Sequence, residues 1–129
     1  TPAPEIKAME GPKITVTGWV DDIREQFAAS RIMLAPMLIS IGMQNKILQA
    51  MAMRIPCLVT SLANNAIAAP PGEAIIVAET AAEFADQVLR LLNAPDEADQ
   101  IAAEGMRFVC KTYDWELTGR QLSKIICRK

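Results

Sequence analysis

Residues 32–60 read IMLAPMLISIGMQNKILQAMAMRIPCLVT, and this stretch decides the fold. Two short apolar runs within it, Ile32–Ala35 and Pro56–Thr60, predict strands that are buried on both faces. Between them, Met43–Met53 carries apolar side chains at spacings of three and four residues, which predicts an amphipathic helix. An apolar strand, a helix and a second apolar strand are typical of a βαβ unit in a parallel sheet.

The segments on either side extend this alternation of strands and helices. The expected elements, in chain order, are a helix at Thr1–Glu10, a strand at Ile14–Thr17, a helix at Val20–Ser30, a strand at Ala74–Val77 and helices that open at Thr80, Pro95 and Asp114. The pattern leaves the form of Ser61–Ala69 open. The sequence therefore predicts an α/β, Rossmann-like, three-layer domain over residues 1–129. We expect a mostly parallel sheet of about four strands, helices on both faces and an all-helical C-terminal end.

Two of these helices carry specific signals. Thr80 is followed three residues later by Glu83, which is the pattern of a capping box. The last helix is predicted from Asp114 as its cap and from an apolar stripe formed by Trp115, Leu122, Ile125 and Ile126.

Composition excludes several classes of function. With 51% hydrophobic residues in a chain of 129, we expect one domain with a substantial core. The net charge is −2 and there is no basic cluster, so no nucleic-acid partner is expected. The sequence has no histidine, which removes the usual Ser/His and Cys/His catalytic pairs and most zinc sites. We therefore expect no bound metal.

The cysteines and the hydropathy pattern favour a cytoplasmic location. Cys57, Cys110 and Cys127 include no closely spaced pair, which is typical of reduced, buried thiols. No apolar run approaches the ~20 residues of a membrane span, and Thr1–Pro4 does not open a signal peptide. We therefore expect no membrane span in this chain.

The predicted sheet indicates where a ligand binds. In open parallel sheets, ligands lie beyond the carboxyl ends of the strands. That rule places the candidate site in four loops, namely Gly18–Asp21, Pro36–Gln44, Thr60–Asn65 and Ala78–Glu79.

The start of the Met43–Met53 helix is a candidate anion site. Gly42 allows a tight turn, and the helix that follows presents free N–H groups and a positive dipole end. Lys46 in the first turn opposes this dipole, a penalty that a bound phosphate would reverse. Asn45, Lys46 and Gln49 share one polar face. On spacing and dipole grounds alone, a solvated helix face is the commoner explanation.

Two other strand ends carry weaker signals. Gly18, Trp19 and Val20 follow a predicted strand and are suited to a nucleobase, whereas a turn capped by Asp21 or Asp22 is the simpler interpretation. The asparagine pair Asn64-Asn65 can meet a sugar or simply form a turn.

The order of these motifs resembles a known family. Lys46–Thr60, KILQAMAMRIPCLVT, is similar to the signature of family 4 (group 1) glycosyltransferases, in which a helix reading Glu-Ala-Met-Ala precedes a Gly-x-Pro-Val-Val strand. Val16–Asp21 and Ala28–Pro36 resemble the preceding strand and loop segments, and Tyr113–Glu116 resembles the opening of the last helix. The resemblance runs over almost the whole chain.

The resemblance implies the C-terminal, donor-binding domain of the two-domain GT-B architecture. Such enzymes transfer a sugar from a UDP or GDP sugar, with retention at the anomeric carbon and without a metal or other cofactor. The implied donor diphosphate and sugar residues are Gly42, Met43, Gln44, Asn45 and Lys46. Gln49 stands at the position that binds the ribose, and Gly18, Trp19 and Val20 stand where the family holds the base. No catalytic residue is assigned.

The chain departs from the family pattern in four respects. Gln49 replaces the ribose-binding Glu, and Ile41 replaces a second Glu that contacts the donor sugar. Arg54-Ile55 stands where a Gly normally precedes the strand. Two strand–helix units of the donor domain and the acceptor-binding N-terminal domain are also absent from this sequence. An incomplete sheet of this kind invites self-association.

The sequence therefore predicts the donor-binding part of a retaining glycosyltransferase of polysaccharide or glycoconjugate biosynthesis. We expect it to be inactive as an isolated chain and cytoplasmic, with the full-length protein able to lie at the inner membrane face. A degenerate, non-catalytic nucleotide-sugar-binding or interaction module is one alternative. A sugar-nucleotide epimerase on the same architecture is another, although the lack of histidine disfavours it.

Overall fold

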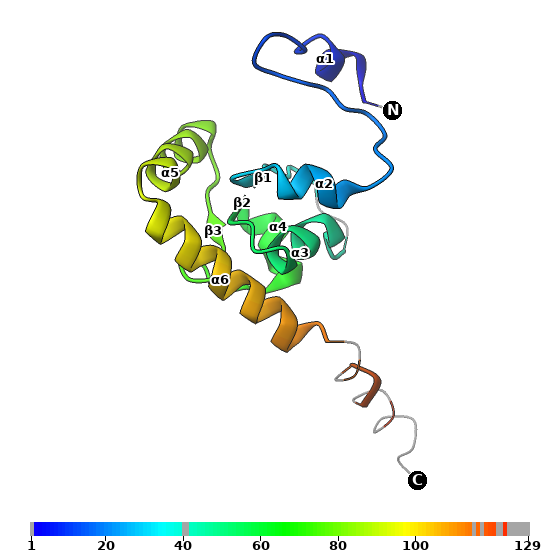
Figure 1. The fold of residues 1–129 in the computed structure, drawn as a ribbon, viewed down its shortest axis with the longest axis vertical. Helices are drawn as coiled ribbons and strands as arrows, with labels where there is room; N and C mark the ends of the chain where they lie inside the picture. Colours follow the sequence, from blue (N-terminus) through cyan, green and yellow to red (C-terminus); the bar gives the residue numbers. More distant parts are fainter. Residues whose placement is uncertain (1, 40–41, 115, 117, 121–122, 124–129) are drawn as a thin grey trace.

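The computed structural model describes residues 2–39, 42–114, 116, 118–120 and 123 (Figure 1). Its helices and strands, in chain order, are α1 (Pro4–Lys7), α2 (Ile23–Ala28), β1 (Met33–Ala35), α3 (Asn45–Ala52), β2 (Cys57–Val59), α4 (Ser61–Ile67), β3 (Ile76–Val77), α5 (Ala81–Asn93) and α6 (Pro95–Thr112). The βαβ unit predicted from residues 32–60 corresponds to β1, α3 and β2.

The strands form a parallel sheet in the order β1-β2-β3. Ala35 pairs with Val59, and Val59 pairs with Val77, so β2 lies in the centre. All three residues of β2 are at most 1% exposed. This complete burial agrees with the continuous apolar sequence of β2, because helices cover both faces of a parallel sheet.

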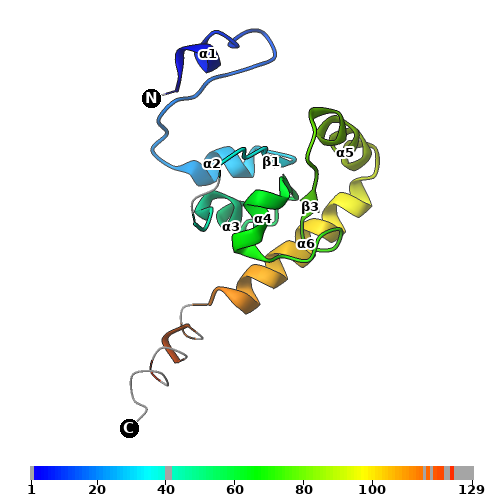
Figure 2. The ribbon, with the colours of Figure 1, turned by 180° about the vertical axis from the view of Figure 1, so that it is seen from behind.

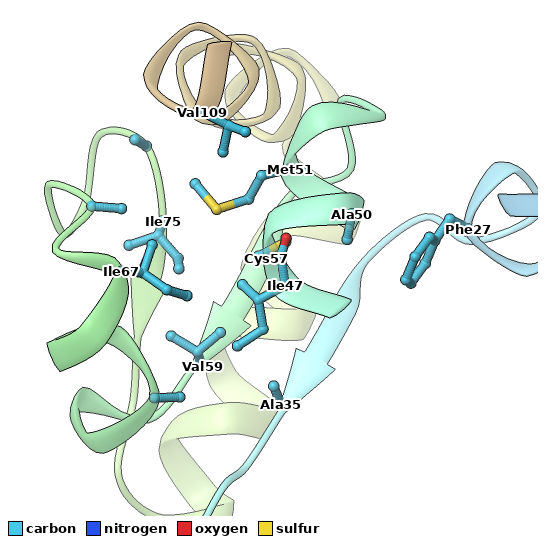
Figure 3. Packing of buried hydrophobic residues seen from close by; sticks show 13 residues of the cluster. Phe27, Ala35, Ile47, Ala50, Met51, Cys57, Val59, Ile67, Ile75 and Val109 are labelled. Carbon is cyan, nitrogen blue, oxygen red and sulfur yellow. The ribbon is translucent and has the colours of Figure 1, made fainter. Parts of the chain in front are cut away.

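The core lies on both faces of this sheet. On one face, Val59 packs with Ile47 and Met51 of α3 and with Ile67 of α4, as Figure 3 shows. On the other face, the side chain of Leu58 belongs to a separate buried cluster. The other members of that cluster come from β3, α5, α6 and the loop after β3, and they are Ile76, Ala78, Phe84, Leu91 and Ile101. Neighbouring residues of β2 therefore serve opposite layers, which confirms the Rossmann-like, three-layer prediction.

A glycine allows α6 to lie close against the segment before β3. A Cβ added at Gly105 would lie 2.8 Å from the backbone oxygen of Ala74 and 3.5 Å from Cε of Met51. Backbone atoms cannot retreat from such a contact as a flexible side chain can. Gly105 thus sets how closely α6 approaches the core.

The N-terminal part differs from the sequence prediction. Ile14–Thr17 is not a strand, because Ile14 forms only an isolated antiparallel bridge with Gly11 and no neighbouring strand pairs with the segment. The sheet in the described part of the chain therefore has three strands rather than four. The helices predicted at Thr1–Glu10 and Val20–Ser30 are also shorter, forming α1 and α2 respectively.

Residues 2–22, here called the N-terminal arm, extend away from the rest of the molecule. Figures 1 and 2, seen from opposite sides, both show α1 and the following segment apart from the sheet. Residues 2–26, all of which the structure describes, include none that is buried, and Phe27 is the first core residue. A strand in the arm has no core to pack on, which explains why the β-rich sequence of Ile14–Thr17 does not form one.

Downstream, one open question is settled and one prediction remains untested. Ser61–Ala69 contains the helix α4, which Thr60 caps by accepting from the N–H of Ala63. The stripe of the predicted last helix, Trp115, Leu122, Ile125 and Ile126, lies outside the described residues.

Candidate functional site

The predicted donor loop follows β1 and is tied to the end of β2. The N–H of Met37 donates to the carbonyl oxygen of Ala35 at 2.9 Å. The hydroxyl of Thr60, a residue only 5% exposed, donates to the carbonyl oxygen of Met37 at 2.9 Å. The base of the loop is therefore fixed to the carboxyl end of the sheet, where ligands of such folds bind.

The loop leads into α3 through a left-handed glycine. Gly42 has φ 71°, a conformation that other residues rarely adopt. Helix α3 then begins at Asn45, with Gln44 in the N-cap position. The sequence prediction placed the tight turn and the helix start at these positions.

The N-terminus of α3 differs from those of its neighbours in its charge. Its N-cap makes no side-chain capping bond, and its first turn contains no acidic residue. By contrast, α2 is capped by Asp22, and α5 has the complete capping box of Thr80 and Glu83. The backbone N–H of Ser61, in the first turn of α4, donates to Oε1 of Glu79 at 3.0 Å. The positive end of α3 thus carries no acidic side chain of its own helix, which favours an external anion.

The polar face predicted on α3 is present. Asn45, Lys46 and Gln49 are exposed, whereas Ile47 and Met51 on the opposite face are at most 1% exposed. Gly42 and Met43 are also exposed, and Gln44 is half-buried. The residues predicted to contact the diphosphate, sugar and ribose therefore lie along one accessible surface.

Glu79 is a site feature that the sequence did not reveal. Its carboxylate caps α4 through Ser61, and this hydrogen bond lowers the pKa of Glu79. Its own N–H donates to Oε2 of Glu83 at 2.7 Å. The residues are far apart in sequence, so only the parallel pairing of β2 and β3 brings them together.

The structure places the predicted base-binding residues on the N-terminal arm. Gly18 has φ 64°, and Trp19 is 90% exposed. The two hollows that Trp19 borders are lined by other arm residues and by Glu25 and Gln26 of α2. A role of Gly18, Trp19 and Val20 in base binding stays a prediction.

Asp22 serves as a cap. Its Oδ1 accepts from the backbone N–H of Arg24 at 2.9 Å, and the Arg24 guanidinium contacts both carboxylate oxygens. The side-chain hydrogen bond from Arg24, followed by its backbone hydrogen bond, lowers the pKa of Asp22 to about 2. This carboxylate is held in its charged form, which suits a helix cap and not a proton donor.

The asparagine pair divides into a buried and an exposed member. Asn64 is 9% exposed and hydrogen-bonds to the backbone of Ala69, so it closes a turn. Asn65 is exposed. The turn interpretation therefore holds for Asn64.

The remaining polar and sulfur groups give no metal or membrane site in the described residues. They contain no group of three or more His, Cys, Asp or Glu side chains that could hold a metal ion. No described helix is long and apolar enough to cross a membrane. Cys57 is buried, whereas Cys110 is exposed, contrary to the expectation of buried thiols, and Cys127 lies outside the described residues. Ile41, at the second family Glu position, also lies outside them.

Comparison with known proteins establishes the family. Residues 1–94 match the family model described as glycosyl transferases group 1, and the chain belongs to this family. No curated protein matches the chain. The crystal structure of HepE from Anabaena in complex with UDP is similar in fold, with a TM-score of 0.78 and 14% sequence identity over 85% of this chain. The match covers 31% of the HepE chain, so the present chain spans about a third of that length.

Proposed function

We propose that this chain is the nucleotide-sugar-binding part of a retaining glycosyltransferase. Membership of the group 1 glycosyltransferases supports the reaction class. The observation that carries the assignment of the site is the N-terminus of α3, which lies beyond the carboxyl end of β1 without an acidic residue in its first turn. A donor diphosphate is the anion that this class of enzyme brings to such a position.

In the proposed complex, the diphosphate and sugar lie against Gly42–Lys46. The N–H groups of the first turn of α3 point toward the ligand, and Lys46 adds a positive charge. Gln49 lies one turn further on the same exposed face and donates or accepts hydrogen bonds with the ribose hydroxyls. Binding needs neither a metal nor another cofactor in this arrangement.

The neutral side chain of Gln49 weakens this interaction relative to a Glu. A hydrogen bond between neutral groups contributes about 0.5–1.5 kcal/mol, against about 1.5–3 kcal/mol for a bond to a charged group. The difference corresponds to about tenfold in affinity. Gln49 is also the observation that favours the second candidate, a non-catalytic nucleotide-sugar-binding module.

The acceptor site and the catalytic turnover belong to the remainder of a two-domain protein. We propose that the isolated chain binds donor without transferring sugar. The full protein would act in the cytoplasm, in polysaccharide or glycoconjugate synthesis. Detectable sugar transfer or donor hydrolysis by this chain alone would contradict the first of these statements.

An NMR titration of the chain with UDP, GDP and their sugar conjugates tests the donor site. UDP is the first probe because the HepE structure was determined with it. We expect saturable shifts of the amides at Gly42–Gln49, and the base loop Gly18–Val20 responds if it closes on the ligand. Absence of shifts at Gly42–Gln49 with every nucleotide would remove the proposed site.

Two substitutions locate the ligand on α3. Lys46→Ala removes a charged contact and should weaken binding by about tenfold or more. Lys111→Ala, at the other end of the molecule on α6, is the matched control and should leave affinity unchanged. Gln49→Glu should tighten binding by about tenfold, and an unchanged affinity would argue against ribose at this position.

A further inference from the structure

The edge of the sheet at β1 is open. Within the described residues, β1 pairs only with β2. The N–H of Met33 donates to Pro56 at 3.0 Å, and the carbonyl of Ala35 accepts from Thr60 at 3.4 Å. Because successive backbone groups alternate in direction, the N–H and C=O of Leu34 point to the other side. The Leu34 side chain is 48% exposed, so β1 presents both hydrogen-bonding groups and apolar surface to an additional strand.

The same chain carries a β-rich segment without a strand partner. Ile14–Thr17 lies in the N-terminal arm, and Ile14 is 45% exposed. Ile6 and Met9 of the arm are 50% and 56% exposed. The arm therefore also presents apolar surface that nothing in its own chain covers.

Topology defines how this segment fits the open edge. Ile14–Thr17, α2 and β1 follow one another as the strand, helix and strand of a βαβ unit, in which the two strands are parallel. The stretch 18–32 exceeds the minimum of about 10–12 residues for such a crossover. A strand formed by Ile14–Thr17 thus suits the edge of β1 in the same parallel sense as β2.

In the structure the arm leads away from the β1 edge of its own chain. Helix α2 is fixed by Phe27 in the core and by its Asp22 cap, and Figures 1 and 2 show the preceding segment extending outward. An extended arm beside an unfilled edge is the arrangement from which two copies exchange an identical element. Each copy provides one strand and one edge, so a two-fold exchange leaves neither unpaired.

We propose that two copies of this chain exchange N-terminal arms, with Ile14–Thr17 of each copy pairing in parallel with β1 of the other. The occupant of the edge is therefore a second copy, and the dimer is independent of nucleotide-sugar binding. Leu34 would become covered in the dimer, together with part of the apolar surface of the arm.

Cross-linking between separately prepared chains tests the exchange directly. One chain carries Val16→Cys and the other Leu34→Cys, both in a background with Cys110→Ser and Cys127→Ser. The remaining Cys57 is buried, which raises its pKa to about 12 and makes its thiol unreactive. On mixing with a short bis-maleimide, we expect a cross-linked heterodimer, because only a contact between copies can join the two cysteines.

A matched pair shows whether the link is specific. Val16→Cys mixed with Leu89→Cys, on an exposed face of α5, should give no comparable product. Equal cross-linking to both positions would mean random collision and would overturn the proposal. A chain with both Val16→Cys and Leu34→Cys that links only within itself would show that the arm docks on its own β1, which also overturns it.

Sedimentation of two arm variants provides a second test. The unsubstituted chain should show a concentration-dependent dimer. Val16→Pro removes a backbone donor from the exchanged strand and should abolish the dimer. Because residue 16 lies in the arm, the thermal unfolding of the body should be unchanged. Met9→Ser removes apolar surface outside the strand and should retain the dimer. A monomer at every concentration without substitution would refute the exchange.

Discussion

The side chain of Asn64 and the backbone of Ala69 form a closed pair of hydrogen bonds. Nδ2 of Asn64 donates to the Ala69 carbonyl at 2.9 Å, and the Ala69 N–H donates to Oδ1 at 3.1 Å. Between them, Ala68 adopts a left-handed conformation with φ 57° and ends α4. The Tyr113 hydroxyl donates to the Ile67 carbonyl at 2.7 Å and attaches the end of α6 to the same turn. This asparagine therefore stabilises the exit from α4.

The pair Asn64 and Asn65 offers a matched test of this role. Asn64→Ala removes both bonds and leaves the buried Ala69 backbone groups unsatisfied, which should lower the free energy of unfolding by about 1–3 kcal/mol. Asn65→Ala, at the exposed neighbour, should change it by less than ~0.5 kcal/mol. Urea unfolding measures both values. Equal effects would contradict the turn role, and a loss of donor affinity only in Asn65→Ala would revive the sugar-contact interpretation for that residue.

Thr60 provides a second test, on the base of the donor loop. Its hydroxyl donates to Met37 and accepts from the N–H of Ala63. Thr60→Val keeps the side-chain shape but removes both bonds, so it should cost about 1–2 kcal/mol of unfolding free energy. Thr60→Ser retains the hydroxyl and should recover most of that loss. A urea midpoint as low in Thr60→Ser as in Thr60→Val would show that the methyl group and not the hydroxyl matters.

Local sequence patterns predicted the sheet and helices wherever local and tertiary preferences agree. The capping box of Thr80 and Glu83 forms as predicted, with the Glu83 N–H donating to Thr80 Oγ1 at 3.2 Å. The apolar stripe of α3 likewise becomes buried while its polar face stays exposed. Each of these features depends on residues three or four apart, which a single helix brings together.

Features that depend on a distant neighbour were not predictable in this way. Ile14–Thr17 has the residues of a strand, yet strand formation requires a partner that the segment does not meet in the structure. The contact between Glu79 and Ser61 similarly arises only from the pairing of β2 with β3. For the same reason, the sequence predicted the polar face on α3 but not the position of Trp19 relative to it.

Acid titration provides a third prediction, at Asp22. Its folded-state pKa of about 2 lies below the ordinary value of 3.8, so the folded chain binds fewer protons between these two values. The stabilisation is therefore complete above pH 3.8 and disappears as the pH falls through about 2. A ¹³C NMR titration of the carboxyl group measures the pKa. Arg24→Ala should return it toward 3.8, whereas Arg31→Ala, which removes a different arginine, should leave it low. An unaltered titration in Arg24→Ala would exclude Arg24 as the cause.

The turn after α3 contains a residue in an unfavourable conformation, because Arg54 has φ 58°. The family pattern has Gly here, and a left-handed conformation costs a non-glycine residue about 1–2 kcal/mol. The Arg54 guanidinium lies 2.7 Å from Asp99, but both side chains are largely exposed, so this ion pair contributes at most about 1 kcal/mol.

Two substitutions at Arg54 separate the backbone strain from the ion pair. Arg54→Ala removes the ion pair and keeps the strain, so it should be neutral or destabilising by up to about 1 kcal/mol. Arg54→Gly removes both, and relief of the strain exceeds the greater chain entropy that glycine brings to the unfolded state. We therefore expect Arg54→Gly to be more stable than Arg54→Ala by about 1 kcal/mol in urea unfolding. If the alanine variant proved as stable as the glycine variant, position 54 would not be left-handed in solution, and the tight entry from α3 into β2 would need another explanation.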